Sequence, residues 1–132
     1  MKVLFKYITV LVLLSFSIIT KAATITSTAS GGSWTSTATW ATGVVPTSTD
    51  DVVIASGATV NLNVTTTVAS MSFLSSASSN STLKLNGYTL TISGALTIPR
   101  ADFNNNKINL VDVGSGILNA VSYTHLTLPT KA

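Results

Sequence analysis

Short runs in which apolar and polar residues alternate dominate this chain. Val60 to Val64 alternates with Asn at every second position, and Leu90-Thr91-Ile92 and Leu96-Thr97-Ile98 repeat the pattern. A period of two is the signature of half-buried β-strands. No stretch after Ala23 shows a helical period, so the sequence predicts an all-β fold. Turn signals close the runs, for example at Ser56-Gly57, Asn86-Gly87, Ser93-Gly94 and Gly114 to Gly116.

The turns alone do not distinguish a sandwich of hairpins from a solenoid, since Asn86-Gly87 is also a hairpin signal. Spacing favours the solenoid, because apolar positions recur at nearly equal intervals that match the length of one coil. We therefore expect the start of a right-handed parallel β-helix, with a Trp-containing cap over about 23–50 and coils over about 51–120. The recurring positions are Leu62 with Leu85 and Ile108, Met71 with Ile92, and Leu74 with Leu96.

The segment 1–22 has the composition of a secretory signal peptide. Lys2 and Lys6 precede an apolar run from Tyr7 to Ile19, and small residues follow it. The run is shorter than the roughly 20 residues that a membrane-spanning helix needs. We expect a helical leader, cleaved after Ala22 or Ala23, and hence a protein that is exported to the cell exterior or outer surface and not held in the membrane afterwards.

Removing the leader changes the charge. Between Ala23 and Ala120 there are three basic and four acidic residues, a net charge of −1, although the whole chain carries +3. We therefore expect no nucleic-acid partner, because no basic patch remains to neutralise phosphates. The chain has no cysteine, which excludes disulfides, thiolate metal sites and an acylated cysteine after the leader.

The C-terminal segment 121–132 differs from everything before it. Val121 to Thr130 reads VSYTHLTLPT, which is the translation of the transposon end and read-one adapter used in tagmentation sequencing libraries. We expect this tail to be non-native and the true protein to continue past Ala120. The alternative is a short native C-terminal strand. His125, the only histidine, is therefore not taken as a catalytic or metal-binding candidate.

A series of short motifs follows in order within the segment 32–94. They are Trp34, Thr39-Trp40, Gly43-Val44-Val45-Pro46, Asp50-Asp51, Val52-Val53-Ile54 and Gly57-Ala58-Thr59-Val60. In this order they resemble the opening of the eight-glycine (G-eight-like) extracellular domain and its bacterial relatives. The resemblance implies an N-terminal β-helix in a large secreted or surface protein, often one exported by the type IX route with a C-terminal sorting domain. No sorting domain is visible in the sequence.

Asp50 and Asp51 form the only adjacent pair of carboxylates. They are a candidate calcium site, since calcium takes six to eight oxygen ligands; no other cofactor is expected. The structural alternative, which we favour, is a turn in which the carboxylates accept backbone N–H bonds before the strand that begins at Val52.

Trp34 and Trp40 are candidates for a carbohydrate-binding platform, because a flat ring with a polar edge suits a pyranose. Since both precede the alternating segments, the favoured alternative is that they cap the first coil.

Two further sequence patterns are weaker candidates for functional sites. Arg100, Asp102, Lys107 and Asp112 gather near the end of the chain, where an exposed charged turn is a better explanation than a lyase-like site. Thr-x-Thr pairs begin at Thr24, Thr65 and Thr89, and a flat array of such pairs could bind ice. They are not expected to recur in coil register, and high β-propensity explains them better.

These observations predict a non-catalytic β-helical module of a secreted or cell-surface bacterial protein, with an adhesion, stalk or glycan-contact role. Its expected partner is an extracellular polysaccharide or surface glycan. Two alternatives stay open: the N-terminal part of a carbohydrate-active β-helix enzyme whose catalytic residues lie further on, and a passive spacer.

Overall fold

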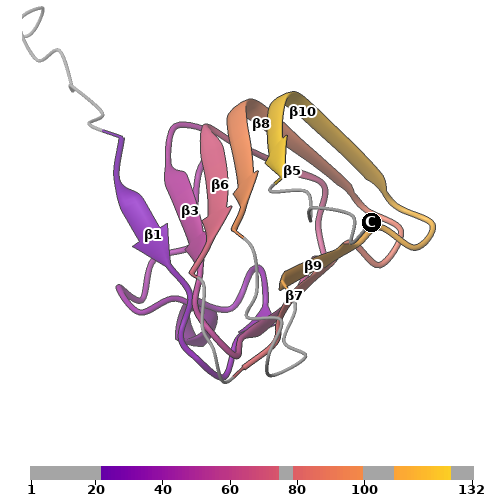
Figure 1. Cartoon of the computed structure of the whole chain (residues 1–132). Coiled ribbons are helices and arrows are strands. Elements are labelled where there is room, and N and C mark those ends of the chain that lie inside the picture. Colours follow the sequence, from indigo (N-terminus) through magenta and orange to yellow (C-terminus); the bar gives the residue numbers. More distant parts are fainter. Residues whose placement is uncertain (1–21, 75–78, 100–108, 126–132) are drawn as a thin grey trace, which may run out of the picture.

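The computed structural model describes residues 22–74, 79–99 and 109–125, and it is an all-β parallel solenoid of about three turns. Figure 1 shows the strands of the larger sheet side by side along the solenoid, from β1 at the N-terminal end to β10 at the other. The expected leader helix falls on residues outside this description. The described residues contain a short 3-10 helix but no α-helix, and no helix among them is long and apolar enough to span a membrane.

Two parallel sheets form the walls of the solenoid. The larger has the order β1 (Thr24–Thr26), β3 (Asp51–Ile54), β6 (Ser70–Phe73), β8 (Thr89–Ile98) and β10 (Ile117–His125), with β5 (Thr66–Val68) also paired to β8. The smaller has the order β2 (Gly32–Ser33), β4 (Thr59–Asn61), β7 (Ser81–Lys84) and β9 (Asn109–Asp112). A short 3-10 helix, η1 (Thr37–Thr39), follows β2.

The register stacks equivalent residues of successive coils into columns. Val60 pairs with Leu83 and Leu83 with Val111, so one column of valine and leucine side chains runs through the smaller sheet. The alternation predicted from the sequence places these residues inside, and Val60 and Leu83 are fully buried. In the larger sheet the matching inner column is Ile25, Val52, Met71, Leu96 and Tyr123. No single coil could bury this apolar surface, so stacking supplies the core.

The coil length varies more than the sequence spacing indicated. Met71 pairs with Leu96, whereas Ile92 pairs with Val68. The expected equivalences of Met71 with Ile92 and of Leu74 with Leu96 are therefore wrong. The corners between strands differ in length, and side-chain periodicity within strands carries no information on corner length.

The third predicted repeat, Leu62 with Leu85 and Ile108, is right for its first step only. The Leu62 N–H bonds the carbonyl of Lys84, which places Leu62 level with Leu85 as the spacing predicted. Leu85 continues to the level of Val113 and not to Ile108, because its N–H bonds the carbonyl of Asp112.

The corner at Ser93-Gly94 is a bend within one long strand, β8, where the sequence predicted a break between two strands. Between the pairs Val68–Ile92 and Met71–Leu96, the two residues Ala69 and Ser70 face the three residues 93–95. The Gly94 N–H donates to the Ala69 carbonyl over 2.7 Å, and a Cβ on Gly94 would lie 2.8 Å from that oxygen. Glycine is therefore required by close backbone approach, which permits the strand to bend without losing its partner.

The turn at Asn86-Gly87 joins the two sheets and does not make a hairpin. Both residues have positive φ, 50° and 87°, as a tight turn of this sequence requires. The strands it connects, β7 and β8, lie in different sheets and each pairs in parallel with the coils on either side. The Asn86 side chain donates to the Leu62 carbonyl over 3.1 Å, so the turn is also bonded to the preceding coil.

Candidate functional site

The two tryptophans close the N-terminal end of the apolar core. Trp34 follows β2, and its N–H bonds the Asn61 carbonyl over 2.8 Å, which places the ring at the head of the column of Leu62 and Leu85. Trp40 meets it edge to face, with ring centroids 4.9 Å apart at 79°. The Trp40 Nε1–H donates to the Trp34 carbonyl over 2.8 Å. Both rings therefore cover the first coil, as the capping interpretation predicts.

Residues 39–41 also protect the outer edge of β1. The Thr28 N–H donates to the Thr39 carbonyl over 2.7 Å, and the Ala41 N–H donates to the Thr26 carbonyl over 2.8 Å. An exposed strand edge would otherwise present these groups to other chains. The cap consists of Trp34 and of residues 37–41. It covers the apolar end of the core and forms hydrogen bonds along part of the outer edge of β1.

The burial of the tryptophans limits what they can bind. Trp34 is 1% exposed and Trp40 is 2% exposed. Stacking of a sugar needs an open ring face. In this conformation neither residue offers one, so the function we propose does not use the two rings for carbohydrate binding.

Asp50 holds the start of the described chain against the loop that follows the cap. Its Oδ1 accepts the Ala23 N–H over 3.0 Å, and its Oδ2 accepts the N–H and the hydroxyl of Thr47 over 2.8 and 2.7 Å. The bonds from Thr47 lower the pKa of Asp50 below its ordinary value of 3.8, against a smaller opposing effect of burial. This is the capped turn that we favoured from the sequence, here completed by Ala23, which is distant along the chain.

Asp51 is the first residue of β3, so the strand begins one residue before the predicted Val52 and Asp51 does not belong to the turn. Its Oδ1 accepts the hydroxyl of Ser70 from the next coil over 2.5 Å. The two carboxylates thus have separate partners, and within the described residues no three acidic, histidine or cysteine side chains gather to hold a metal ion. Both carboxylate oxygens of Asp50 and the Oδ1 of Asp51, which were proposed as calcium ligands, accept hydrogen bonds within the fold.

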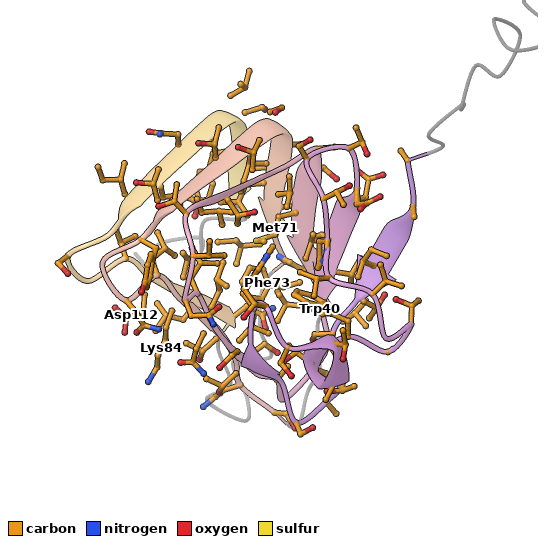
Figure 2. The ribbon with its side chains drawn as sticks, turned by 180° about the vertical axis from the view of Figure 1, so that it is seen from behind. Trp40, Met71, Phe73, Lys84 and Asp112 are labelled. Carbon is orange, nitrogen blue, oxygen red and sulfur yellow. The ribbon has the colours of Figure 1, made fainter. Side chains whose placement is uncertain are left out.

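Lys84 and Asp112 lie side by side on the outer face of the smaller sheet, on neighbouring strands (Figure 2). Met71 and Phe73 in the same view point to the interior, together with Trp40. The other members of the charged group, Arg100, Asp102 and Lys107, lie outside the described residues. The structure therefore describes one member of that group, Asp112, as an exposed strand residue.

The threonine pairs correct one expectation. Thr67 pairs with Thr91, and the Thr89 N–H bonds the Thr65 hydroxyl, so these two pairs do recur in coil register. Sequence spacing missed this because the third pair, at Thr24 and Thr26, lies on another part of the larger sheet, beside Asp51 and Val53. The array ends in the next coil, where Asn119 stands beside Thr91.

The C-terminal end of the solenoid contains an apolar hollow that sequence reasoning did not find. It has a volume of about 450 Å³, and Leu96, Val111, Val113, Leu118 and Tyr123 contribute to its lining. Val121 to His125 of the adapter-like tail continue β10 beside β8. A position in a strand does not test whether these residues are native, so the adapter origin of the tail stays a prediction. No sequence pattern signals such a hollow, because it exists only where no described coil covers the last one.

No protein-family model matches the chain, and no curated protein or solved structure matches it either.

Proposed function

We propose that this chain is a non-catalytic β-solenoid module at the start of a secreted or surface-attached bacterial protein. In this proposal it acts as a stalk or adhesion segment that presents following domains to an extracellular polysaccharide or surface glycan. The leader-like segment 1–22 supports export, and the resemblance to the eight-glycine extracellular domain supports a position near the N-terminus of a larger protein.

The observation that carries the proposal is the way the buried polar side chains are used. Among the described residues every buried side-chain nitrogen or oxygen has a hydrogen-bond partner. Ser27 accepts the Ala55 N–H, Ser81 bonds the backbone of residues 55 and 57, and Thr39 donates to the Ser33 carbonyl. Catalytic residues instead gather in clefts where burial and neighbouring charges shift their pKa values strongly. The hydroxyls of Ser27 and Ser81 join one coil to the next, and that of Thr39 holds the cap together.

The complete protein in its native cells provides the test. Deleting residues 23–120 while keeping the leader should leave the following domains exported and should reduce attachment of the cells to a polysaccharide-coated surface. A matched deletion of a similar length elsewhere in the protein serves as the control. Unchanged attachment would reject the adhesion and stalk role.

A second measurement distinguishes the proposed non-catalytic module from the enzyme alternative, in which the catalytic residues lie further on in the protein. The purified complete protein is incubated with acidic and neutral polysaccharides, and new reducing ends and unsaturated products are measured. We expect neither product. Their release by the complete protein would replace the proposed function with a carbohydrate-active one.

A further inference from the structure

Asp50 is a buried carboxylate without a charged partner among the described residues. Its side chain is 7% exposed, and its three hydrogen bonds come from neutral donors, the Ala23 N–H and the N–H and hydroxyl of Thr47. Lys84 is the one lysine or arginine in the described ranges, and it lies beside Asp112 on the smaller sheet. Aspartate is rarely buried this far unless it is paired. The hydrogen bonds of Asp50 are therefore satisfied, but its charge is not balanced.

Ala23 provides the donor for one of these bonds, and it lies where the leader is expected to end. Its N–H donates to Asp50 Oδ1 over 3.0 Å, and its carbonyl accepts the Asp51 N–H over 2.8 Å. Thr24, the next residue, begins β1 and pairs with Asp51 of β3. The fold thus uses both the nitrogen and the carbonyl of Ala23.

We infer that the leader is removed after Ala22 and that the α-ammonium group created at Ala23 forms an ion pair with the Asp50 carboxylate. A leader peptidase hydrolyses the peptide bond between the two alanines with one water. The carbonyl carbon of Ala22 takes the hydroxyl, and the nitrogen of Ala23 takes the hydrogen. At neutral pH the new acid releases a proton and the new amine binds one. The inference rests on the leader, and so on the export step of the proposed function.

The two expected cleavage positions have different consequences for the fold. Cleavage after Ala23 would remove both hydrogen bonds of this residue and leave Asp50 Oδ1 without the donor it has here. Cleavage after Ala22 keeps the nitrogen in place and changes it from a neutral to a charged donor. The charged donor adds the attraction between opposite charges to the existing hydrogen bond. The geometry therefore favours Ala23 as the first residue of the processed chain.

The exposure of the first described residues suits both the cleavage and the ion pair. Ala22, Ala23 and Thr24 are exposed, so a peptidase can reach the bond, and the ammonium N–H groups that do not face Asp50 can bind water. The cost of the new charge is therefore small, because the penalty for an ion pair arises from removing water from both charges. The Asp50 side chain is already held in place by Thr47 and needs no rearrangement to accept the ammonium.

The pH dependence of the ion pair follows from the groups around Ala23. Asp51 of β3 is the other titratable residue bonded to it, and its carboxylate accepts the hydroxyl of Ser70. Residues 37–41, which border the other side of β1, carry no titratable side chain. An α-amino group has an ordinary pKa of about 7.7–8.0, and a nearby carboxylate raises this pKa in the folded chain. The stability that the pair contributes is therefore complete below that range and is lost as the pH rises through the raised value.

The first test identifies the N-terminus. The full chain is expressed with its leader in its native cells, and the exported protein is analysed by N-terminal sequencing and intact mass. We expect it to begin at Ala23. A protein that begins at Thr24, or one that keeps the leader, would overturn the inference.

The second test measures the ion pair in two matched chains. One begins at Ala23 and the other at Ala22, each released from a removable fusion partner, and both end at Ala132. The second chain keeps the Ala23 N–H as a neutral donor. At about pH 6, where the amine is protonated, the chain that begins at Ala23 should unfold at a higher urea concentration. At about pH 10 the two unfolding midpoints should become equal, because the amine is then neutral.

Asp50→Asn in both chains separates the ion pair from other effects of the added residue. It should bring the two midpoints together at about pH 6. Three results would overturn the pairing: equal midpoints before the substitution, a difference that Asp50→Asn leaves in place, or a difference that persists at about pH 10. The last needs no substituted chain, so the test holds even where Asp50→Asn prevents folding.

These outcomes are distinct from a failure of the proposed function. Cleavage at another position, or equal midpoints, would overturn the inference and leave the cell-attachment test unaffected. Unchanged attachment in that test would reject the adhesion and stalk role, while the start at Ala23 and its ion pair with Asp50 would stand.

Discussion

Asp50 connects the first described residues of the chain to the loop before β3 through three hydrogen bonds. Replacing it with Asn keeps the size but sets an amide NH2 group against an N–H donor at Ala23 or Thr47. We expect Asp50→Asn to lower the free energy of unfolding by about 1.5–3 kcal/mol, the usual contribution of hydrogen bonds to a charged group. Urea unfolding at neutral pH measures this. Asp51→Asn, which affects one bond to Ser70, is the control and should cost less.

The acid sensitivity of the fold follows from the same carboxylate. Its pKa is lowered in the folded state, so its contribution is complete above 3.8 and is lost as the pH falls through the folded value. The difference in stability between the unsubstituted chain and Asp50→Asn should therefore shrink below pH 3.8. A stability difference between the two chains that stays constant through pH 3.8 and below would contradict this role of Asp50.

Adding calcium or a chelator at neutral pH should leave the unfolding midpoint of the unsubstituted chain unchanged.

The indole N–H of Trp40 can be separated from the packing of its ring. Trp40→Phe keeps an aromatic ring and removes the bond to the Trp34 carbonyl, so we expect a loss of about 1 kcal/mol together with a small packing cost. Trp40→Ala removes the whole ring from the cap and should cost about 3–5 kcal/mol. Thermal and urea unfolding compare the two. Equal effects would mean that the ring contributes little beyond its hydrogen bond.

At the scale of elements, the close approach of coils is tested by two glycines with nearly the same backbone. Gly31 and Gly43 have φ of 65° and 69°, so alanine at either position adds a similar conformational cost of about 1–2 kcal/mol. A Cβ on Gly31 would lie 2.1 Å from the Thr59 carbonyl of the next coil, whereas a Cβ on Gly43 meets nothing within 4 Å. Gly31→Ala should therefore destabilise the fold by several kcal/mol more than Gly43→Ala. Similar unfolding midpoints for the two variants would contradict the coil spacing.

The sequence predicted the strands and their inward faces better than it predicted the corners. Alternation identifies Val60, Leu83 and Leu96 as inner residues, because strand side chains keep a strict period of two. It gives no coil length, because corners of neighbouring coils can differ by a residue, as the two residues 69–70 and the three residues 93–95 do. The turn role of Asp50 was predictable from its position before a strand. Its bond to Ala23 was not, because that contact forms only when a whole coil brings the two residues together.

At the scale of the whole molecule, stability should fall from the covered coils toward the open end. β6 and β8 each have a partner on both sides, whereas β9 and β10 have one each among the described strands. Hydrogen exchange should therefore be slowest at the paired amides of β6 and β8 and faster in β9 and β10, where alternate amides face the unpaired edge. Mass spectrometry of proteolytic fragments can resolve this. Uniform protection in all four strands would show that the last coil is covered in solution.

The closed N-terminal end also limits how large an aggregate the molecule can form. Parallel sheets with two open ends can add copies without limit, which is the geometry of a fibre. Here the Trp34 and Trp40 cap blocks one of the two ends of the described solenoid, so a copy that associates through its open end has no second end to offer. End-to-end association of this chain therefore terminates at two molecules, and the cap acts as a chain terminator for assembly.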